Sequence, residues 1–119
     1  LFNIESGFER LEFNRIFSTN EGWWYSPTNS LTTGQWHHVA VTYDETSLSN
    51  DPALYIDGVS QTVTEGQAPV GTVVNNTDNY LIGNRSAEDR GFDGEIDDMR
   101  IYNRVLSEAE ITELYNSTR

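Results

Sequence analysis

The sequence predicts an all-β protein in which two antiparallel sheets pack face to face and one short helix follows near the C-terminus. Short runs of alternating apolar and polar residues are bounded by Gly, Asn, Asp or Pro, which is typical of strands and turns. Seven such runs within 119 residues favour two packed sheets. The predicted strands are FERLEFN (8–14), GWWYS (22–26), WHHVAVTYD (36–44), ALYIDG (53–58), VSQTVTE (59–65), NYLIGN (79–84) and EIDDMRIYN (95–103).

The second predicted strand holds the densest aromatic cluster of the chain, Trp23, Trp24 and Tyr25. Adjacent strand residues point to opposite faces, so Trp23 and Tyr25 share one face and Trp24 lies on the other. At least one large ring is therefore expected at the surface, where a sugar ring can stack on it, and the three residues are the predicted ligand-binding site. The alternative is that all three rings fill the core and its rim, since aromatic side chains are mostly buried.

The third predicted strand carries the only two histidines, His37 and His38. Because neighbouring strand residues face opposite ways, these two side chains do not readily share one metal ion. One is expected to pack or hydrogen-bond beside Trp36, and the other to lie nearer solvent. Two histidines also give a Ser-His-Asp catalytic triad little to build on, so no catalytic residue is predicted here.

Two local signals define the end of a hairpin and the start of a helix. Asp57 and Gly58 form the two-residue turn that matches strand twist, so Asp57 is predicted to be a turn residue and not a ligand. Near the C-terminus the apolar period changes from two to that of a helix, and Ser107 with Glu110 three residues later forms a capping box. Both signals concern the fold, and neither predicts a functional residue.

Composition excludes several classes of partner. Nineteen Asp and Glu against seven Lys and Arg give a net charge of -12, which repels nucleic acid and anionic membrane surfaces. The same carboxylates suit calcium, or they simply keep a secreted protein soluble. No cysteine is present, and no apolar run is long enough to span a membrane. The chain starts at Leu1 and its one methionine is Met99, so we expect a piece of a longer protein.

Three stretches taken together carry a family resemblance. They are GQWHHVAVTYD (34–44), LYIDG (54–58), and LIGN (81–84) followed by FDGEIDDMRIYNRVLSEAEITELY (92–115). In order and spacing they resemble the laminin G-like branch of the concanavalin A-like lectin and glucanase superfamily. The resemblance implies a jelly roll of two antiparallel sheets, used as an appended module in secreted or cell-surface proteins. It also implies binding of glycans or proteins, and in many members one calcium ion.

One departure from the family concerns the start of the chain. The family opens with further strands that carry an FDG-like motif, and nothing before residue 8 corresponds to them. We therefore expect residues 1–119 to form a single domain that lacks the usual N-terminal strands, unless another chain or segment supplies them. Missing strands leave open sheet edges, and pairing of such edges predicts a homodimer.

The acidic segment near residue 95 resembles the motif with which glucanases of this superfamily cleave β-glucans. That motif is E-x-D-x-E or E-x-D-x-x-E, because a nucleophile and an acid/base carboxylate must lie about 5 Å apart. Here Glu95 and Asp97 fill the first two positions, but Met99 and Arg100 stand where the last carboxylate belongs. The sequence therefore predicts a protein without glycosidase activity.

Asp97 raises a separate question about metal binding. On a regular strand it shares a face with Met99, a buried face on which an unpaired carboxylate is costly. Its partner is then either calcium, with Asp93, Asp98 or loop carbonyls as further ligands, or backbone amides and a guanidinium such as that of Arg100 or Arg104. The resemblance implies that the aspartate of a G-x-I-D motif, here Asp97, lies close to calcium, so Asp97 and Asp93 are the predicted metal ligands, and calcium is the expected cofactor.

These observations favour a noncatalytic, lectin-like, carbohydrate-binding module of a larger secreted or cell-surface protein. The alternative is a structural or adhesive module that contacts other proteins and has no sugar groove. A β-glucan-cleaving glycoside hydrolase is the third possibility and is disfavoured by Met99. The identity of the ligand does not follow from strand motifs, because specificity in such folds depends on loops.

Overall fold

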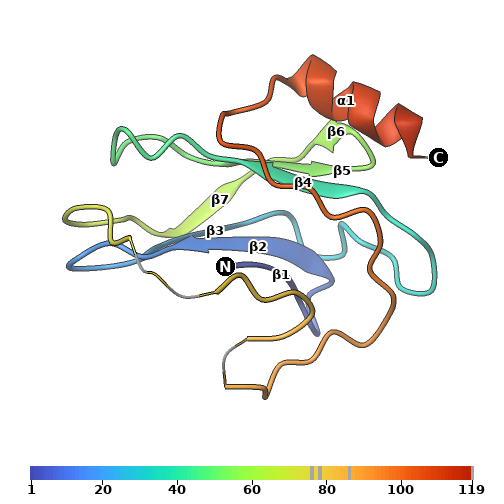
Figure 1. The fold of residues 1–119 in the computed structure, drawn as a ribbon, viewed down its shortest axis with the longest axis horizontal. Coiled ribbons are helices and arrows are strands. Elements are labelled where there is room, and N and C mark those ends of the chain that lie inside the picture. The colour runs from blue at the N-terminus through green and yellow to red at the C-terminus, as the bar shows by residue number, and fades with distance from the viewer. Residues whose placement is uncertain (76, 78, 86, 119) are drawn as a thin grey trace.

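The computed structural model describes residues 1–75, 77, 79–85 and 87–118, and its strands form two antiparallel sheets that pack face to face (Figure 1). The predicted all-β fold with one C-terminal helix is confirmed. The first sheet has the order β1-β2-β3-β7, with β1 Phe2–Glu5, β2 Arg10–Arg15, β3 Gly22–Tyr25 and β7 Thr64–Gln67. The second has the order β4-β5-β6, with β4 Val39–Thr42, β5 Ala53–Ile56 and β6 Val59–Ser60, and the helix α1 spans Glu108–Ser117.

The main core lies between the two sheets. Leu11 of β2 packs there with Leu54 and Ile56 of β5, and Leu31 joins them from the loop after β3. Adjacent residues of a strand face opposite ways, so Tyr55 points to the other side of β5. There it forms a second cluster with Leu106 and with Ile111 of α1, and these contacts hold the helix against the second sheet.

The two local predictions are confirmed. Asp57 (φ 51°) and Gly58 (φ 77°) make the turn between β5 and β6, and both have the positive φ that this turn requires. At the helix start, the Ser107 hydroxyl accepts a hydrogen bond from the Glu110 amide (3.2 Å), and the Glu110 carboxylate accepts one from the Ser107 amide (2.8 Å). This is the predicted capping box.

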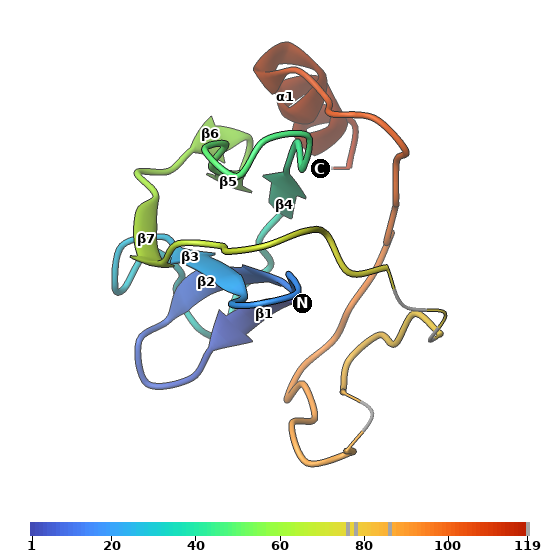
Figure 2. The ribbon, with the colours of Figure 1, turned by 90° about the vertical axis from the view of Figure 1, so that its left-hand side faces the viewer.

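Two of the predicted strands are wrong. Residues 79–84 and 95–103 form no strand, and the segment that contains them runs down one side of the sheets before it returns to α1 (Figures 1 and 2). Its large side chains are exposed, as with Ile96 at 50% and Ile101 at 62%. Alternation alone does not make a strand, because each strand also needs a neighbouring edge to pair with.

Strand boundaries also differ at two other places. The predicted strand 59–65 divides into β6 and β7, which belong to different sheets, so the chain crosses between the sheets within this stretch. At the start of the chain, residues 2–5 form β1, a strand that sequence analysis did not predict. Pairing of β1 with β2 adds Asn3 and Glu5 to the first sheet, and both residues matter for the candidate site.

Candidate ligand-binding face

The structure separates the three predicted ligand-binding residues. Trp24 points into the core and is fully buried, with its ring 6.1 Å from Phe13 and 5.4 Å from Tyr43 between ring centroids. Its indole Nε1 donates a 2.8 Å hydrogen bond to Asp51 Oδ1, which satisfies the only polar group of the ring. Trp24 is thus a core residue that no ligand on the surface touches.

Trp23 and Tyr25 lie on the opposite side of β3, which faces away from the second sheet. Their rings are stacked, with centroids 5.5 Å apart and an interplanar angle of 28°. Trp23 lies against the backbone of β7 at Gly66, where an added Cβ would come within 2.1 Å of the indole. Glycine at this position is therefore what lets the indole lie close to the strand beside it.

Residues from neighbouring strands complete this side of the sheet. In the strand register Glu12 lies between Asn3 and Tyr25, Asn14 lies opposite Trp23, and Glu5 lies opposite Arg10. Directly paired residues share a face of the sheet, so all of them lie on one surface. We call this surface the outer face, and its residues are Asn3, Glu5, Arg10, Glu12, Asn14, Trp23 and Tyr25.

Arg10 is held in place on the outer face by three neighbours. Its guanidinium carbon lies 3.8 Å from the centroid of the Tyr25 ring and 4.5 Å from that of Phe8. Its Nε donates a 2.6 Å hydrogen bond to Glu5 Oε2, and both side chains of this ion pair are partly buried. A cation stacked on aromatic rings and paired with a carboxylate is fixed in orientation, so this part of the face is preorganised.

On the outer face, Glu12 is the titratable group with surroundings least favourable to a charged side chain. Partial burial raises the pKa of its carboxyl above the usual 4.5, and the carboxylate of Glu5 beside it raises the pKa further. Arg10 and Arg90 act in the opposite direction, with smaller effects. Two carboxylates side by side favour a proton or another cation between them.

Two amide oxygens of the outer face are left without a donor. Asn3 Oδ1 and Asn14 Oδ1 are buried, and within the described part of the chain no hydrogen-bond donor reaches either atom. Buried polar atoms normally have a partner, and an unsatisfied one costs free energy. The outer face therefore combines an aromatic surface, a fixed ion pair, a partly buried carboxylate and two unsatisfied acceptors.

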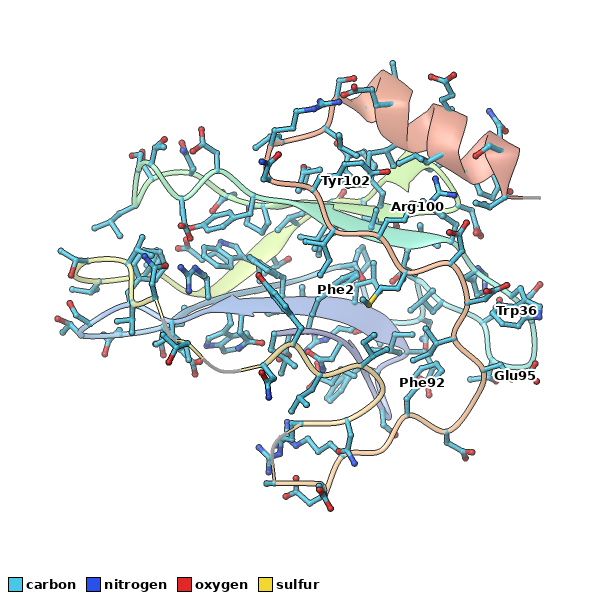
Figure 3. The ribbon with its side chains drawn as sticks, in the orientation of Figure 1. Phe2, Trp36, Phe92, Glu95, Arg100 and Tyr102 are labelled. Carbon is cyan, nitrogen blue, oxygen red and sulfur yellow. The ribbon has the colours of Figure 1, made fainter. Side chains whose placement is uncertain are left out.

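The predicted metal ligands are placed differently from the sequence expectation. The interpretation of Asp97 as a residue on a buried strand face is wrong, since the strand does not form and Asp97 is exposed, as is Asp93. Asp97 Oδ1 accepts a hydrogen bond from the Asp98 amide (2.8 Å), and Asp98 is paired with Arg100 (2.9 Å). Figure 3 shows Glu95 and Arg100 spread along the segment and not gathered around one point.

Within the described residues, no three His, Asp or Glu side chains form a group that could hold a metal ion. A calcium site takes six or more oxygen ligands, which include backbone carbonyls and waters as well as carboxylates. Calcium at Asp93 and Asp97 therefore stays a prediction. No step of the function proposed below uses a calcium ion.

The two histidines have structural partners. His37 Nδ1 lies 2.8 Å from Asp57 Oδ2, and His37 Nε2 lies 2.9 Å from the hydroxyl of Thr32. This chain of contacts connects the loop before β4 to the turn between β5 and β6. His38 packs near Tyr115 of α1, with ring centroids 5.9 Å apart, and burial lowers the pKa of its imidazole.

Five polar residues of the outer face were not predicted from the sequence: Asn3, Glu5, Arg10, Glu12 and Asn14. The alternation of RLEFNR in β2 was a usable signal, because Leu11 and Phe13 point to the core and the residues that alternate with them must point outward. For Asn3 and Glu5 there was no such signal, since β1 itself was not predicted.

Comparison with known proteins gives one family and one solved structure. A family model described as the concanavalin A-like lectin/glucanases superfamily, of the laminin G type, matches residues 2–112. The structure of an S-layer domain-containing protein (residues 221–444) from Clostridium thermocellum is similar, with a TM-score of 0.50 and 29% sequence identity. The similarity covers 90% of this chain but 52% of the other, so the chain spans about half of that structure's length.

No curated protein matches the sequence. Within the described residues, no helix has the length and apolar character needed to cross a membrane.

Proposed function

Because the chain belongs to the concanavalin A-like lectin/glucanase superfamily, we propose that it is a noncatalytic, glycan-binding module whose ligand lies across the outer face. The observation that carries this proposal is the stacked pair of Trp23 and Tyr25, two flat rings on the side of the sheet away from the core. Aromatic faces of this kind stack on the apolar C–H face of a sugar ring.

The carboxylates of the protein support binding more than catalysis. The motif residues Glu95 and Asp97 lie on the exposed segment, and Met99 still stands in place of the third acidic residue. On the outer face, Glu5 is already paired with Arg10 at 2.6 Å, so it is not a free nucleophile. A retaining glycosidase needs two available carboxylates about 5 Å apart.

A structural relative supports a proposal about the setting of the module. The similar structure belongs to an S-layer domain-containing protein, and this chain corresponds to about half of it. We therefore propose that the module is part of a larger, surface-associated protein in which it holds a glycan. The glycan itself is not identified by this comparison.

A second candidate function is contact with another protein. β1 and β4 are edge strands of their sheets, and large apolar side chains are exposed on β1 (Phe2) and on the segment before α1 (Phe92), as Figure 3 shows. Open edges and exposed apolar groups favour pairing with a further strand, including one from a second copy. Light scattering at increasing concentration tests the homodimer, which a constant monomeric mass would contradict.

Affinity gel electrophoresis through a panel of soluble polysaccharides, with calcium and with chelator, tests the glycan proposal. We expect at least one polysaccharide to retard the protein, and Trp23→Ala to lower the affinity by roughly tenfold, since stacking of a ring contributes about 1 kcal/mol or more. Trp36→Ala is the matched control, because Trp36 is 64% exposed and lies outside the outer face.

The possible results of this experiment distinguish the position of the site, the class of ligand and the need for a metal. Retardation that is lost in Trp36→Ala and kept in Trp23→Ala would place the site elsewhere and overturn the proposal. Retardation by no polysaccharide would contradict the glycan function and favour protein contact. Loss of retardation in chelator would show that a metal takes part in binding and would support the predicted calcium ion, with Asp97 as the first residue to replace.

A further inference from the structure

Hydrogen-bond acceptors dominate the part of the outer face that surrounds Glu12. Glu12 itself is a partly buried carboxylate, and the carboxylate of Glu5 is close enough to affect it. Asn3, directly opposite Glu12 in the register, has a buried oxygen without a donor, and so has Asn14. A ligand that donates hydrogen bonds at this place therefore suits these acceptors best.

The cations near Glu12 do not take the place of such a hydrogen-bond-donating ligand. The Arg10 guanidinium donates to Glu5 and lies over the rings of Tyr25 and Phe8, so its position is fixed by these contacts. Arg90 lowers the pKa of Glu12 less than Arg10 does. The N-terminal ammonium donates to the Asn14 backbone oxygen at 2.8 Å and is not bonded to the Asn14 side chain. Arg10 is thus paired with Glu5, and it acts on Glu12 through its charge alone.

We infer that the outer face selects glycans whose sugars carry protonated amino groups, with an ammonium bound between Glu12 and Asn3 and a neighbouring sugar ring packed against Trp23. This inference rests on the proposed glycan function and names its ligand class. An ammonium has three donors and no acceptor, which matches a surface that offers oxygen acceptors. The Asn3 oxygen is buried, so this contact requires its amide group to rotate toward the ligand.

The same chemistry excludes other sugars. Uronic acids and sulfated sugars bring a negative charge next to Glu5 and Glu12, in a chain whose net charge is -12. An N-acetylated sugar keeps one N–H donor but loses the positive charge, and a neutral glucan has only hydroxyl groups. Charge-assisted hydrogen bonds are about twice as strong as neutral ones, so the amino sugar is expected to bind most tightly.

Calorimetric titration of the whole chain with three tetrasaccharides tests the inference. The three are a β-1,4-linked glucosamine tetramer, its N-acetylated form and a β-1,4-linked glucose tetramer, used at about pH 6 so that the amino groups carry protons. We expect the glucosamine tetramer to bind roughly tenfold more tightly than the other two. Glu12→Gln, which keeps the shape of the side chain, is expected to remove this difference.

Glu95→Gln provides the control for attraction by net charge. It changes the charge by the same amount, but Glu95 is exposed on the segment outside the outer face, so the preference for glucosamine is expected to persist. Equal loss of the preference in Glu12→Gln and Glu95→Gln would show unspecific attraction and overturn the inference. Equal affinity for all three tetrasaccharides would overturn it while the glycan function stands. Binding of none of them, together with no retardation by any polysaccharide, would overturn both.

Discussion

The two sides of β3 give neighbouring tryptophans different surroundings. Trp24 is enclosed by Phe13 and Tyr43, and its one polar atom is bonded to Asp51. Trp23, one residue earlier, lies on the backbone of the adjacent strand and is stacked on Tyr25 at the surface. The pleat of a strand is the reason, because it sends successive side chains to opposite faces.

Under the proposed function, one short strand contributes to stability through its inner side and to ligand binding through its outer side. The inner side is filled by apolar contacts and loses heavily when one of them is removed. The outer side is ordered by stacking and by the ion pair of Arg10 with Glu5, and it still has unsatisfied acceptors on Asn3 and Asn14. A surface that is rigid but incompletely paired is suited to a ligand.

Replacement of each tryptophan tests the comparison with the largest expected effect. Trp24→Ala leaves a cavity in the core and is expected to lower the free energy of unfolding by about 3–5 kcal/mol. Trp23→Ala is expected to lower it by only about 1 kcal/mol, since the ring is at the surface. Urea denaturation of both variants measures this. Equal losses would show that the two sides of β3 do not differ as described.

Replacement of two glycines tests the same contrast more mildly. An alanine Cβ at Gly22 would lie 2.3 Å from the Trp24 ring, and one at Gly66 would lie 2.1 Å from the Trp23 ring. Because Trp24 is enclosed, Gly22→Ala is expected to cost about 1–3 kcal/mol of stability.

For Gly66→Ala the Trp23 ring can move toward solvent, so we expect a smaller loss of stability and a clear loss of polysaccharide retardation. Thermal unfolding and affinity electrophoresis measure the two effects. Retardation that is unchanged in Gly66→Ala would show that the position of the indole is unimportant for binding.

Glu12→Gln is expected to change stability least of these variants, and the change depends on pH. The folded protein raises the pKa of Glu12 above the usual 4.5, so the ionised side chain opposes folding at neutral pH. We expect Glu12→Gln to be more stable than the parent at pH 7, by less than about 1 kcal/mol because the group is partly exposed.

This gain should vanish as the pH falls below the ordinary pKa of glutamate, where Glu12 is protonated in both the folded and the unfolded chain. Glu5, Arg10 and Arg90 are the charged groups that act on Glu12, and they are unchanged in the variant. Melting temperatures at pH 7 and at about pH 3.5 measure the effect. A variant that is less stable at pH 7 would contradict the unfavourable surroundings of Glu12.

Patterns that depend on a few adjacent residues were predicted from the sequence. The turn at Asp57 and Gly58 and the cap of α1 at Ser107 both form as expected, because their hydrogen bonds join residues close in the chain. The opposite orientation of Trp23 and Trp24 follows from strand alternation in the same way. Which of the two sides faced the core did not follow, since both carry large aromatic rings.

The failures concern residues whose surroundings come from distant parts of the chain. The segments 79–84 and 95–103 alternate like strands, yet no ladder forms along them, so Asp97 is exposed and is not on a buried face. In the opposite sense, the sequence offered no sign of β1 or of the acceptors that it brings beside Glu12. Neither outcome depends on the propensity of the segment itself.

Local sequence patterns were enough to predict the all-β class, the family, the turn between β5 and β6, the helix cap and the alternation of each strand. The core position of Trp24, the contact of Trp23 with Gly66, and the place of Glu12 between Asn3 and Tyr25 became clear only from the folded chain. The two groups of features differ in the distance along the chain over which their contacts act. Turns, caps and pleats arise from neighbouring residues, whereas pairing, burial and the composition of a surface require segments far apart in the chain to meet.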